Sequence, residues 1–121
     1  MKFREIKNNV FYCGLNDRER KLFDELIPLD MGTSYNSYLI KGNDKTALID
    51  TMYPPKWEEY LKNLDENGVK TIDYIIANHG EQDHTGVLPE LIKKYPEAVI
   101  VTNAVCKGNI IEMLLIPENK I

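Results

Sequence analysis

The first half of the chain shows the short-period hydrophobic pattern that predicts β-strands. Residues 3–15 are rich in β-branched and aromatic side chains, and the Asn-Asn pair at positions 8–9 is a plausible turn between two short strands. Residues 35–41 alternate in character from one position to the next, and residues 45–51 form a second strand-like run. The Gly-Asn-Asp cluster at 42–44 separates these two runs, so we expect an antiparallel hairpin there.

Residues 16–25, which lie between these strands, form a charged stretch of mixed sign that ends at Leu26-Ile27-Pro28. The stretch is compatible with a hairpin loop or with one helical turn. A run of mixed charge usually forms a solvated surface, so we assign no chemistry to it.

Residues 54–68 predict a helix, which a Pro-Pro pair opens and an Asn-Gly pair ends. Its apolar side chains recur with helical spacing and are expected to face the core: Trp57, Tyr60, Leu61 and Leu64. Its polar side chains are expected to face water: Lys56, Glu58, Glu59, Lys62 and Asn63.

The second half alternates strands and helices. Residues 69–77 and 98–102 are predicted strands, and their apolar runs indicate burial on both faces. A helix is predicted between them over residues 87–95, with Thr85 as its candidate N-cap. A weaker helix is expected over residues 104–115, followed by a polar tail.

This order of elements predicts an α/β or α+β fold, a mixed sheet with packed helices. A chain of 121 residues is most simply one domain. Residues 72–102 form a strand–helix–strand unit, which is expected to be a parallel, right-handed crossover.

Composition narrows the function classes. The chain has 15 Lys and Arg against 19 Asp and Glu, a net charge of −4, and no basic stripe, which argues against nucleic-acid binding. Cys13 and Cys106 lie too far apart for a zinc ribbon or a disulfide framework, so two reduced, buried thiols are expected. We find no membrane-spanning run and no signal-peptide core, so a cytoplasmic location is the default expectation.

Both histidines of the chain, His79 and His84, lie within six residues that also include Glu81 and Asp83. Imidazole and carboxylate are ligands for first-row metals, and a turn at the end of a strand is a common place for ligands in open sheets. His79, Glu81 and Asp83 alternate, so an extended or gently curled segment would point them to one side, and a tight curl would bring them together. Asp83 beside His84 would offer ligands in two directions, which suits a pair of metals.

Other interpretations of this cluster remain open. It could be a polar surface loop whose histidines and carboxylates pair with each other, or an acid–base dyad without metal; the density of ligands favours the metal. Gly80 and Gly86 bracket the cluster and would let the backbone fold back. Asp50, at the end of a predicted strand, would bind a nearby backbone amide, or would orient a metal-binding histidine if His79 or His84 lies beside it.

Residues 78–86, Asn-His-Gly-Glu-Gln-Asp-His-Thr-Gly, resemble the first metal motif of the flavodiiron proteins. These are O2- and NO-reducing enzymes built on the metallo-β-lactamase fold. Residues 34–40 and 47–51 resemble the same family, and the resemblance covers about residues 30–105. Hydrolases of the wider superfamily carry histidine where this chain has Glu81, and an oxygen ligand there hardens the site toward iron or manganese.

The resemblance implies a role for each residue of the motif. His79 and Glu81 would bind one iron and Asp83 the other. His84 stays open, because it binds metal in the hydrolases but typically turns away from the iron in the flavodiiron branch.

The resemblance also implies the N-terminal half of an αββα metallo-β-lactamase-like sandwich, so we expect residues 1–121 to be one partial domain. In the family, further histidines and a bridging aspartate complete the diiron site, and a flavodoxin-like domain carries FMN. Neither is expected in this chain. The implied partners are O2 or NO, an electron donor such as rubredoxin, and further copies in a homo-oligomer. We expect catalysis from the full-length family protein and not from this chain alone.

Three functions are therefore considered. The first is a portion of a flavodiiron-type oxidoreductase. The second is a zinc hydrolase of the metallo-β-lactamase superfamily, which Glu81 argues against. The third is a non-catalytic metal-binding module.

Overall fold

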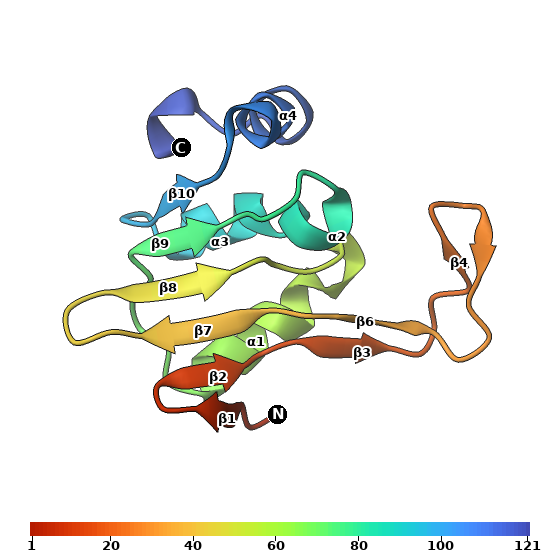
Figure 1. The fold of residues 1–121 in the computed structure, drawn as a ribbon, viewed down its shortest axis with the longest axis horizontal. Coiled ribbons are helices and arrows are strands. Elements are labelled where there is room, and N and C mark those ends of the chain that lie inside the picture. The colour runs from red at the N-terminus through yellow and green to blue at the C-terminus, as the bar shows by residue number, and fades with distance from the viewer.

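The computed structural model describes residues 1–121 and contains a six-stranded mixed sheet (Figure 1). The strand order is β1-β2-β7-β8-β9-β10. The strands are β1 (Arg4–Lys7), β2 (Val10–Tyr12), β7 (Tyr38–Lys41), β8 (Thr46–Ile49), β9 (Tyr74–Ile76) and β10 (Val99–Val101). The first four are antiparallel, whereas β8, β9 and β10 are parallel, which confirms the predicted mixed sheet.

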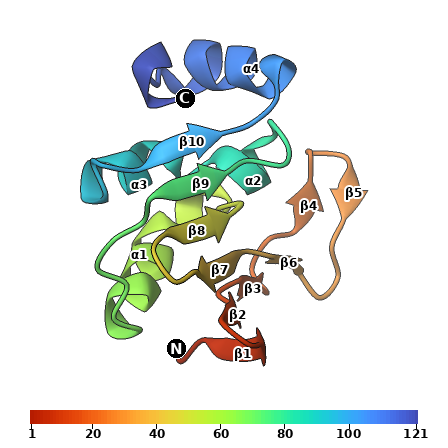
Figure 2. The same cartoon turned by 60° about the vertical axis from the view of Figure 1, so that its left-hand side comes forward.

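Helices pack on one face of this sheet. Figures 1 and 2 show α1 (Trp57–Glu66) and α3 (Leu88–Lys94) on that face, and α4 (Ala104–Leu114) beyond the β10 edge. One apolar core joins the sheet to the helices, and its fully buried members include Leu39, Leu48, Ile75, Ile100, Tyr60, Leu64, Leu88 and Leu91. Burial of each such side chain contributes about 1.5–3 kcal/mol, so this face anchors the fold.

The opposite face of the sheet is open at β9 and β10. Tyr74, Val99 and Val101 are 40%, 42% and 45% exposed. The prediction that both strands are buried on both faces is therefore wrong for these residues, because the helices that cover the sheet all lie on its other side (Figure 2). The predicted strand over residues 69–77 is also shorter, since Val69 ends the connection from α1 with its N–H bonded to the Leu64 carbonyl.

The N-terminal hairpins follow the sequence pattern. Asn9 has a φ of 62° in the turn between β1 and β2, and β7 pairs with β8 as predicted for residues 35–51. Ahead of β7, the strand β6 (Thr33–Tyr35) leaves the main sheet and pairs with β3 (Leu15–Asp17).

Residues 22–28 form a hairpin, β4 (Leu22–Phe23) paired with β5 (Ile27–Pro28), which projects from the body of the molecule (Figure 1). The hairpin was one of the two structures predicted for the charged stretch at residues 16–25. The prediction that the stretch is only a solvated surface is wrong, because Asp17 is 4% exposed.

Most of the apolar side chains that were predicted to face the core from α1 do so. Tyr60 and Leu64 are fully buried, but Trp57, at 41% exposed, is not a core residue. Asn63 was predicted to face water and is buried, because the N-terminus packs against this end of α1 and the Met1 amino group donates to Asn63 Oδ1 at 3.3 Å.

The C-terminal elements end close to their predicted limits. A short α2 (Gln82–Thr85) precedes α3, and α4 covers the predicted helix over residues 104–115. Thr85 is the last residue of α2 and not the N-cap of α3; its hydroxyl donates to the Glu81 carbonyl at 3.0 Å. No helix combines the length and the apolar character that crossing a bilayer would require.

Candidate metal centre

The candidate ligands follow the carboxyl end of β9. The chain leaves the strand after Ile76 and passes through a short loop containing His79. Glu81, in an extended conformation, is the N-cap of α2, so Asp83 and His84 lie on that helical turn. The segment is thus extended at its start and helical at its end, whereas the sequence predicted a single extended or gently curled stretch.

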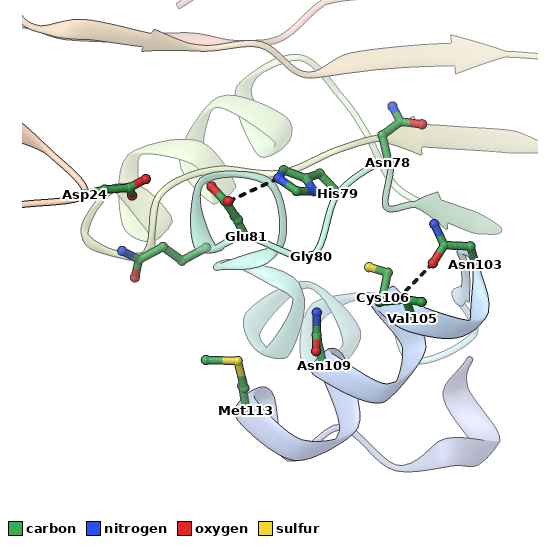
Figure 3. A pocket seen from close by; sticks show the side chains of 11 residues that line it. Asp24, Asn78, His79, Gly80, Glu81, Asn103, Val105, Cys106, Asn109 and Met113 are labelled. Atoms are coloured by element: carbon green, nitrogen blue, oxygen red, sulfur yellow. Dashed lines mark hydrogen bonds and ion pairs between the residues drawn. The ribbon is translucent and has the colours of Figure 1, made fainter. Parts of the chain in front are cut away.

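His79 and Glu81 form an exposed pair. The Nε2 atom of His79 lies 3.3 Å from Oε1 of Glu81, and the two side chains are 56% and 53% exposed. Figure 3 shows both at the mouth of a cavity of about 630 Å³. An imidazole and a carboxylate at this distance are free to turn toward a common ion.

His84 has a carboxylate beside each of its ring nitrogens. Its Nδ1 lies 3.0 Å from Oδ2 of Asp50, and its Nε2 lies 3.6 Å from Oδ2 of Asp83. The His79 and His84 rings meet edge to face, with their centroids 5.2 Å apart. The structure therefore brings Asp50 beside His84, which is the arrangement that an orienting role for Asp50 requires.

Asp50 ties the two ends of the ligand segment together. Its Oδ1 accepts a hydrogen bond from the Asn78 backbone N–H at 2.8 Å, so it contacts residue 78 as well as His84. The next residue, Thr51, donates both its N–H and its hydroxyl to the His84 carbonyl, each at 2.8 Å. Asp50 is 7% exposed and has a φ of 56°, a left-handed conformation that Asp tolerates better than most residues.

The two glycines serve close packing rather than a reversed backbone. A Cβ atom on Gly80 would lie 2.9 Å from the Asn109 side-chain amide. A Cβ atom on Gly86 would lie 2.4 Å from the Gln82 carbonyl oxygen and 2.5 Å from Pro54. Gly86 has a φ of −60°, so the expectation that it lets the chain fold back is wrong.

The donor types fit a borderline or hard divalent metal, with one imidazole and two carboxylates in the set His79, Glu81 and Asp83. In the structure these side chains meet only two at a time. No group of three or more His, Cys, Asp or Glu side chains converges tightly enough to hold an ion. His79 and Glu81 are more than half exposed, so their side chains are free to rotate. Such a rotation is enough to bring them together with Asp83 around one ion.

Other elements complete the cavity around His79 and Glu81. Asp24, from the turn of the β4–β5 hairpin, faces it from one side, and residues of α4 face it from the other (Figure 3). The contributions around α4 are Asn103, Val105, Cys106, Asn109 and Met113. The sequence did not connect any of these residues with the candidate ligands. Only Asn103 carried a local signal, as an N-cap whose side chain accepts from the Cys106 N–H at 2.9 Å.

A second cavity, of about 400 Å³, lies on the other side of the segment and is lined by Tyr35, Asp50, Asp83 and His84 among others. Behind it, the Tyr35 hydroxyl donates to Oδ2 of Asp17 at 2.8 Å. The Arg20 guanidinium lies 4.0 Å from the Tyr53 ring centroid and donates to the Tyr35 hydroxyl at 3.3 Å.

The pKa values in this cluster reflect burial and hydrogen bonding. Burial alone raises the pKa of Asp17, but the Tyr35 hydroxyl, the Lys56 ammonium and two backbone N–H groups outweigh it, so the pKa is lowered. Burial raises the pKa of Tyr35 to about 12. Asp17 is therefore a charged, buried anchor for the base of the hairpin.

The cysteines take no part in a disulfide. Cys13 and Cys106 are both buried and free, which confirms the expectation of two buried thiols.

Comparison with known proteins places this geometry in context. The family model described as the metallo-beta-lactamase superfamily matches residues 31–105. The flavo-diiron protein FprA2 of Clostridium acetobutylicum is 42% identical over 102 residues, which are 83% of this chain and 25% of that protein. The anaerobic nitric oxide reductase flavorubredoxin of Aliivibrio fischeri is 40% identical over 112 residues, 91% of this chain and 22% of that protein.

The same similarity is seen in three dimensions. The rubredoxin oxygen:oxidoreductase of Desulfovibrio gigas matches with a TM-score of 0.86 and 27% identity, over 95% of this chain and 29% of that one. The resemblance to flavodiiron proteins and the predicted fold class are confirmed. The chain spans about a quarter of the length of the curated relatives that it matches.

Proposed function

The chain belongs to the metallo-β-lactamase superfamily, and we propose that it is a portion of a flavodiiron-type oxidoreductase that reduces O2 or NO at a non-haem diiron site. The observation that carries the proposal is the carboxylate of Glu81, 3.3 Å from His79 at the carboxyl end of a parallel strand. A zinc hydrolase of the superfamily would place a third imidazole at this position. The similarity to named O2- and NO-reducing proteins supports the same assignment.

The resemblance to the flavodiiron family supports the ligand roles that we propose. His79 and Glu81 would hold one iron, and Asp83, on the following helical turn, would hold the other. Iron bound there would supply electrons and open coordination positions for a small diatomic substrate. We assign His84 to neither iron, because the matching histidine typically turns away from the metal in the flavodiiron branch; here its Nδ1 lies 3.0 Å from Oδ2 of Asp50 and its Nε2 lies 3.6 Å from Oδ2 of Asp83.

Three protein ligands do not fill two iron coordination spheres. The proposal therefore assigns the remaining ligands, FMN and the flavodoxin-like domain to parts of the protein other than these 121 residues. The electron donor is a small redox protein such as rubredoxin, a choice supported by the name of the Desulfovibrio gigas relative. The buried free thiols support a reducing, cytoplasmic setting.

The open apolar face at β9 and β10 supports association of this chain with another protein surface. Exposed valines on a sheet edge and its face favour contacts with a second copy or with another domain. We propose that the isolated chain forms homo-oligomers through this face.

A chimeric enzyme tests the proposed function. Residues 1–121 replace the matching segment of the Clostridium acetobutylicum flavo-diiron protein, and O2 and NO consumption are measured with an artificial reductant. We expect consumption well above that of a chimera carrying His79→Ala and Glu81→Ala. A chimera that folds and binds FMN and iron, yet is no faster than this double variant, would overturn the proposal.

A second candidate is a non-catalytic metal-binding module, in which the exposed His79–Glu81 pair and Asp83 bind a single ion. Such a module would bind metal in stoichiometric amounts, and the chimera would then show no reductase activity. Ester hydrolysis by the zinc-loaded chain would instead support the hydrolase.

A further inference from the structure

Three fully buried polar side chains meet directly behind Asp50: Cys13, Ser37 and Tyr60, each 0% exposed. The Ser37 hydroxyl donates to the Asp50 carbonyl at 2.9 Å. The hydroxyl oxygen of Ser37 also lies 2.7 Å from the Tyr60 hydroxyl and 3.3 Å from the Cys13 sulfur. None of these residues touches the candidate ligands, and the proposed chemistry does not use them.

The hydrogen-bonding capacity of Ser37 is fully used in this cluster. A serine hydroxyl has one proton to donate and two lone pairs to accept with. The proton goes to the Asp50 carbonyl, so the Cys13 thiol and the Tyr60 hydroxyl both donate to Ser37. Burial raises the pKa of Cys13 to about 11 and that of Tyr60 well above its usual value, so both groups carry their protons at neutral pH.

The residue that receives this hydrogen bond has an unusual backbone. Asp50 combines a φ of 56° with 7% exposure, and a non-glycine residue in this conformation persists only where its surroundings hold it. Two backbone contacts do so: its N–H donates to the Ile76 carbonyl at 2.8 Å, and its carbonyl accepts from Ser37. The direction of its carboxylate toward Asn78 and His84 depends on this conformation.

We propose that Ser37, backed by Tyr60, is a positioning residue that fixes the backbone of Asp50 and so sets the distance between the two ends of the ligand segment. Asp50 contacts residue 78 at the start of that segment and His84 at its end. Release of the Asp50 carbonyl therefore loosens both contacts at once, although Ser37 touches neither end. The metal-binding part of this inference rests on the proposed function, whereas the geometric part does not.

A purely structural role for the cluster makes a different prediction. Buried hydroxyl groups in a core stabilise the whole fold, and their loss speeds amide exchange in proportion to global unfolding. A positioning role predicts a local effect at Asn78, whose N–H is bonded to Asp50. Tyr95 offers a matched control, because its buried hydroxyl donates to the Val69 carbonyl at 3.0 Å, away from Asp50.

The experiment compares Ser37→Ala, Tyr60→Phe and the control Tyr95→Phe by NMR amide hydrogen exchange. We expect Ser37→Ala to speed exchange at Asn78 by about tenfold relative to core amides, the effect of losing about one hydrogen bond. Tyr60→Phe should give a smaller change in the same direction, and Tyr95→Phe no local change. If Ser37→Ala does not fold, exchange at Asn78 in Tyr60→Phe tests the positioning role. Unchanged relative exchange at Asn78 in the folded variants overturns the inference.

Titration with Mn²⁺ supplies the second readout. Loss of the support behind metal ligands typically weakens metal binding by about 10–100-fold. We expect a loss at the low end of this range in Ser37→Ala and none in Tyr95→Phe. If the unmodified chain does not bind Mn²⁺ at His79, Glu81 and Asp83, the ligand assignment fails, while Asn78 exchange still decides the positioning role. Equal affinity in all variants, with binding intact, overturns the inference.

Discussion

The Oδ2 atom of Asp50 lies 3.0 Å from Nδ1 of His84, a residue 34 positions later in the chain. This contact joins the end of an antiparallel hairpin to the helical turn that follows a parallel strand. It fixes the His84 ring, which meets the His79 ring edge to face, and through Asn78 it also holds the start of the ligand segment.

Replacement of Asp50 by Asn tests what the carboxylate contributes. Asn also tolerates a left-handed backbone, so Asp50→Asn removes the charge without adding strain. We expect a loss of about 1–3 kcal/mol in the free energy of unfolding, because hydrogen bonds to a buried charged group are lost. Urea denaturation measures the change. Asp44→Asn, in an exposed turn, is the control, and equal stability of the two variants would contradict the prediction.

Replacement of Glu81 by His should change the metal preference. An imidazole in place of a carboxylate softens the site, so Glu81→His should raise the affinity for Zn²⁺ relative to Mn²⁺ by about tenfold or more. Competition between the two ions, measured as bound metal, gives the ratio. Glu97→His, on an exposed position away from the segment, should leave the ratio unchanged. The same change in both variants would remove Glu81 from the ligand set.

Asp17 should make stability depend on pH. Its folded pKa lies below the unfolded value of about 4, so its ionised form adds stability above that pH. This stability is lost as the pH falls through the lower folded value. We expect Asp17→Asn to be about 1–3 kcal/mol less stable at pH 7, with the difference from the unmodified chain shrinking below about pH 4.

Urea denaturation from pH 3 to pH 7 measures this difference. Asp30→Asn, on an exposed residue nearby, is the control and should show no such trend. A difference for Asp17→Asn that stays constant over the whole range would show that its charge adds nothing.

The open sheet face should drive self-association. Val101 is 45% exposed on the edge strand β10, and Val101→Lys places a charge on this face. We expect the unmodified chain to sediment as an oligomer and Val101→Lys to shift it toward the monomer. Leu26→Lys changes a more exposed apolar residue, 82% exposed on the hairpin, and should have no effect. A monomeric unmodified chain would contradict the prediction.

Local patterns predicted the elements, and long-range contacts decided the details. The hairpin over residues 35–51 and the helix after Pro54-Pro55 followed from periodicity and turn residues, which act over a few positions. The exposure of Trp57 and the burial of Asn63 depend on which segments pack against α1, and no local pattern contains that information.

The residues of the candidate site also fall into those that local sequence revealed and those that only the fold revealed. The ligand segment was found because its residues are neighbours in sequence, and the resemblance to a family added their roles. Asp24 and Asn109 lie near His79 only through the path of the hairpin and of α4, so the sequence gave no signal for them. Asp17 was missed because a charge in a mixed-sign run is usually solvated, and its burial depends on a hydroxyl from Tyr35.

Paramagnetic broadening of backbone amide signals by Mn²⁺ tests most directly whether the segment binds metal. A substoichiometric amount of Mn²⁺ broadens amides close to the bound ion. We expect the signals of residues 79–83 to broaden first, and the effect to disappear in a variant carrying His79→Ala and Glu81→Ala. Broadening that spreads over exposed carboxylates such as Glu66 and is unchanged in this variant would contradict a metal site at this segment.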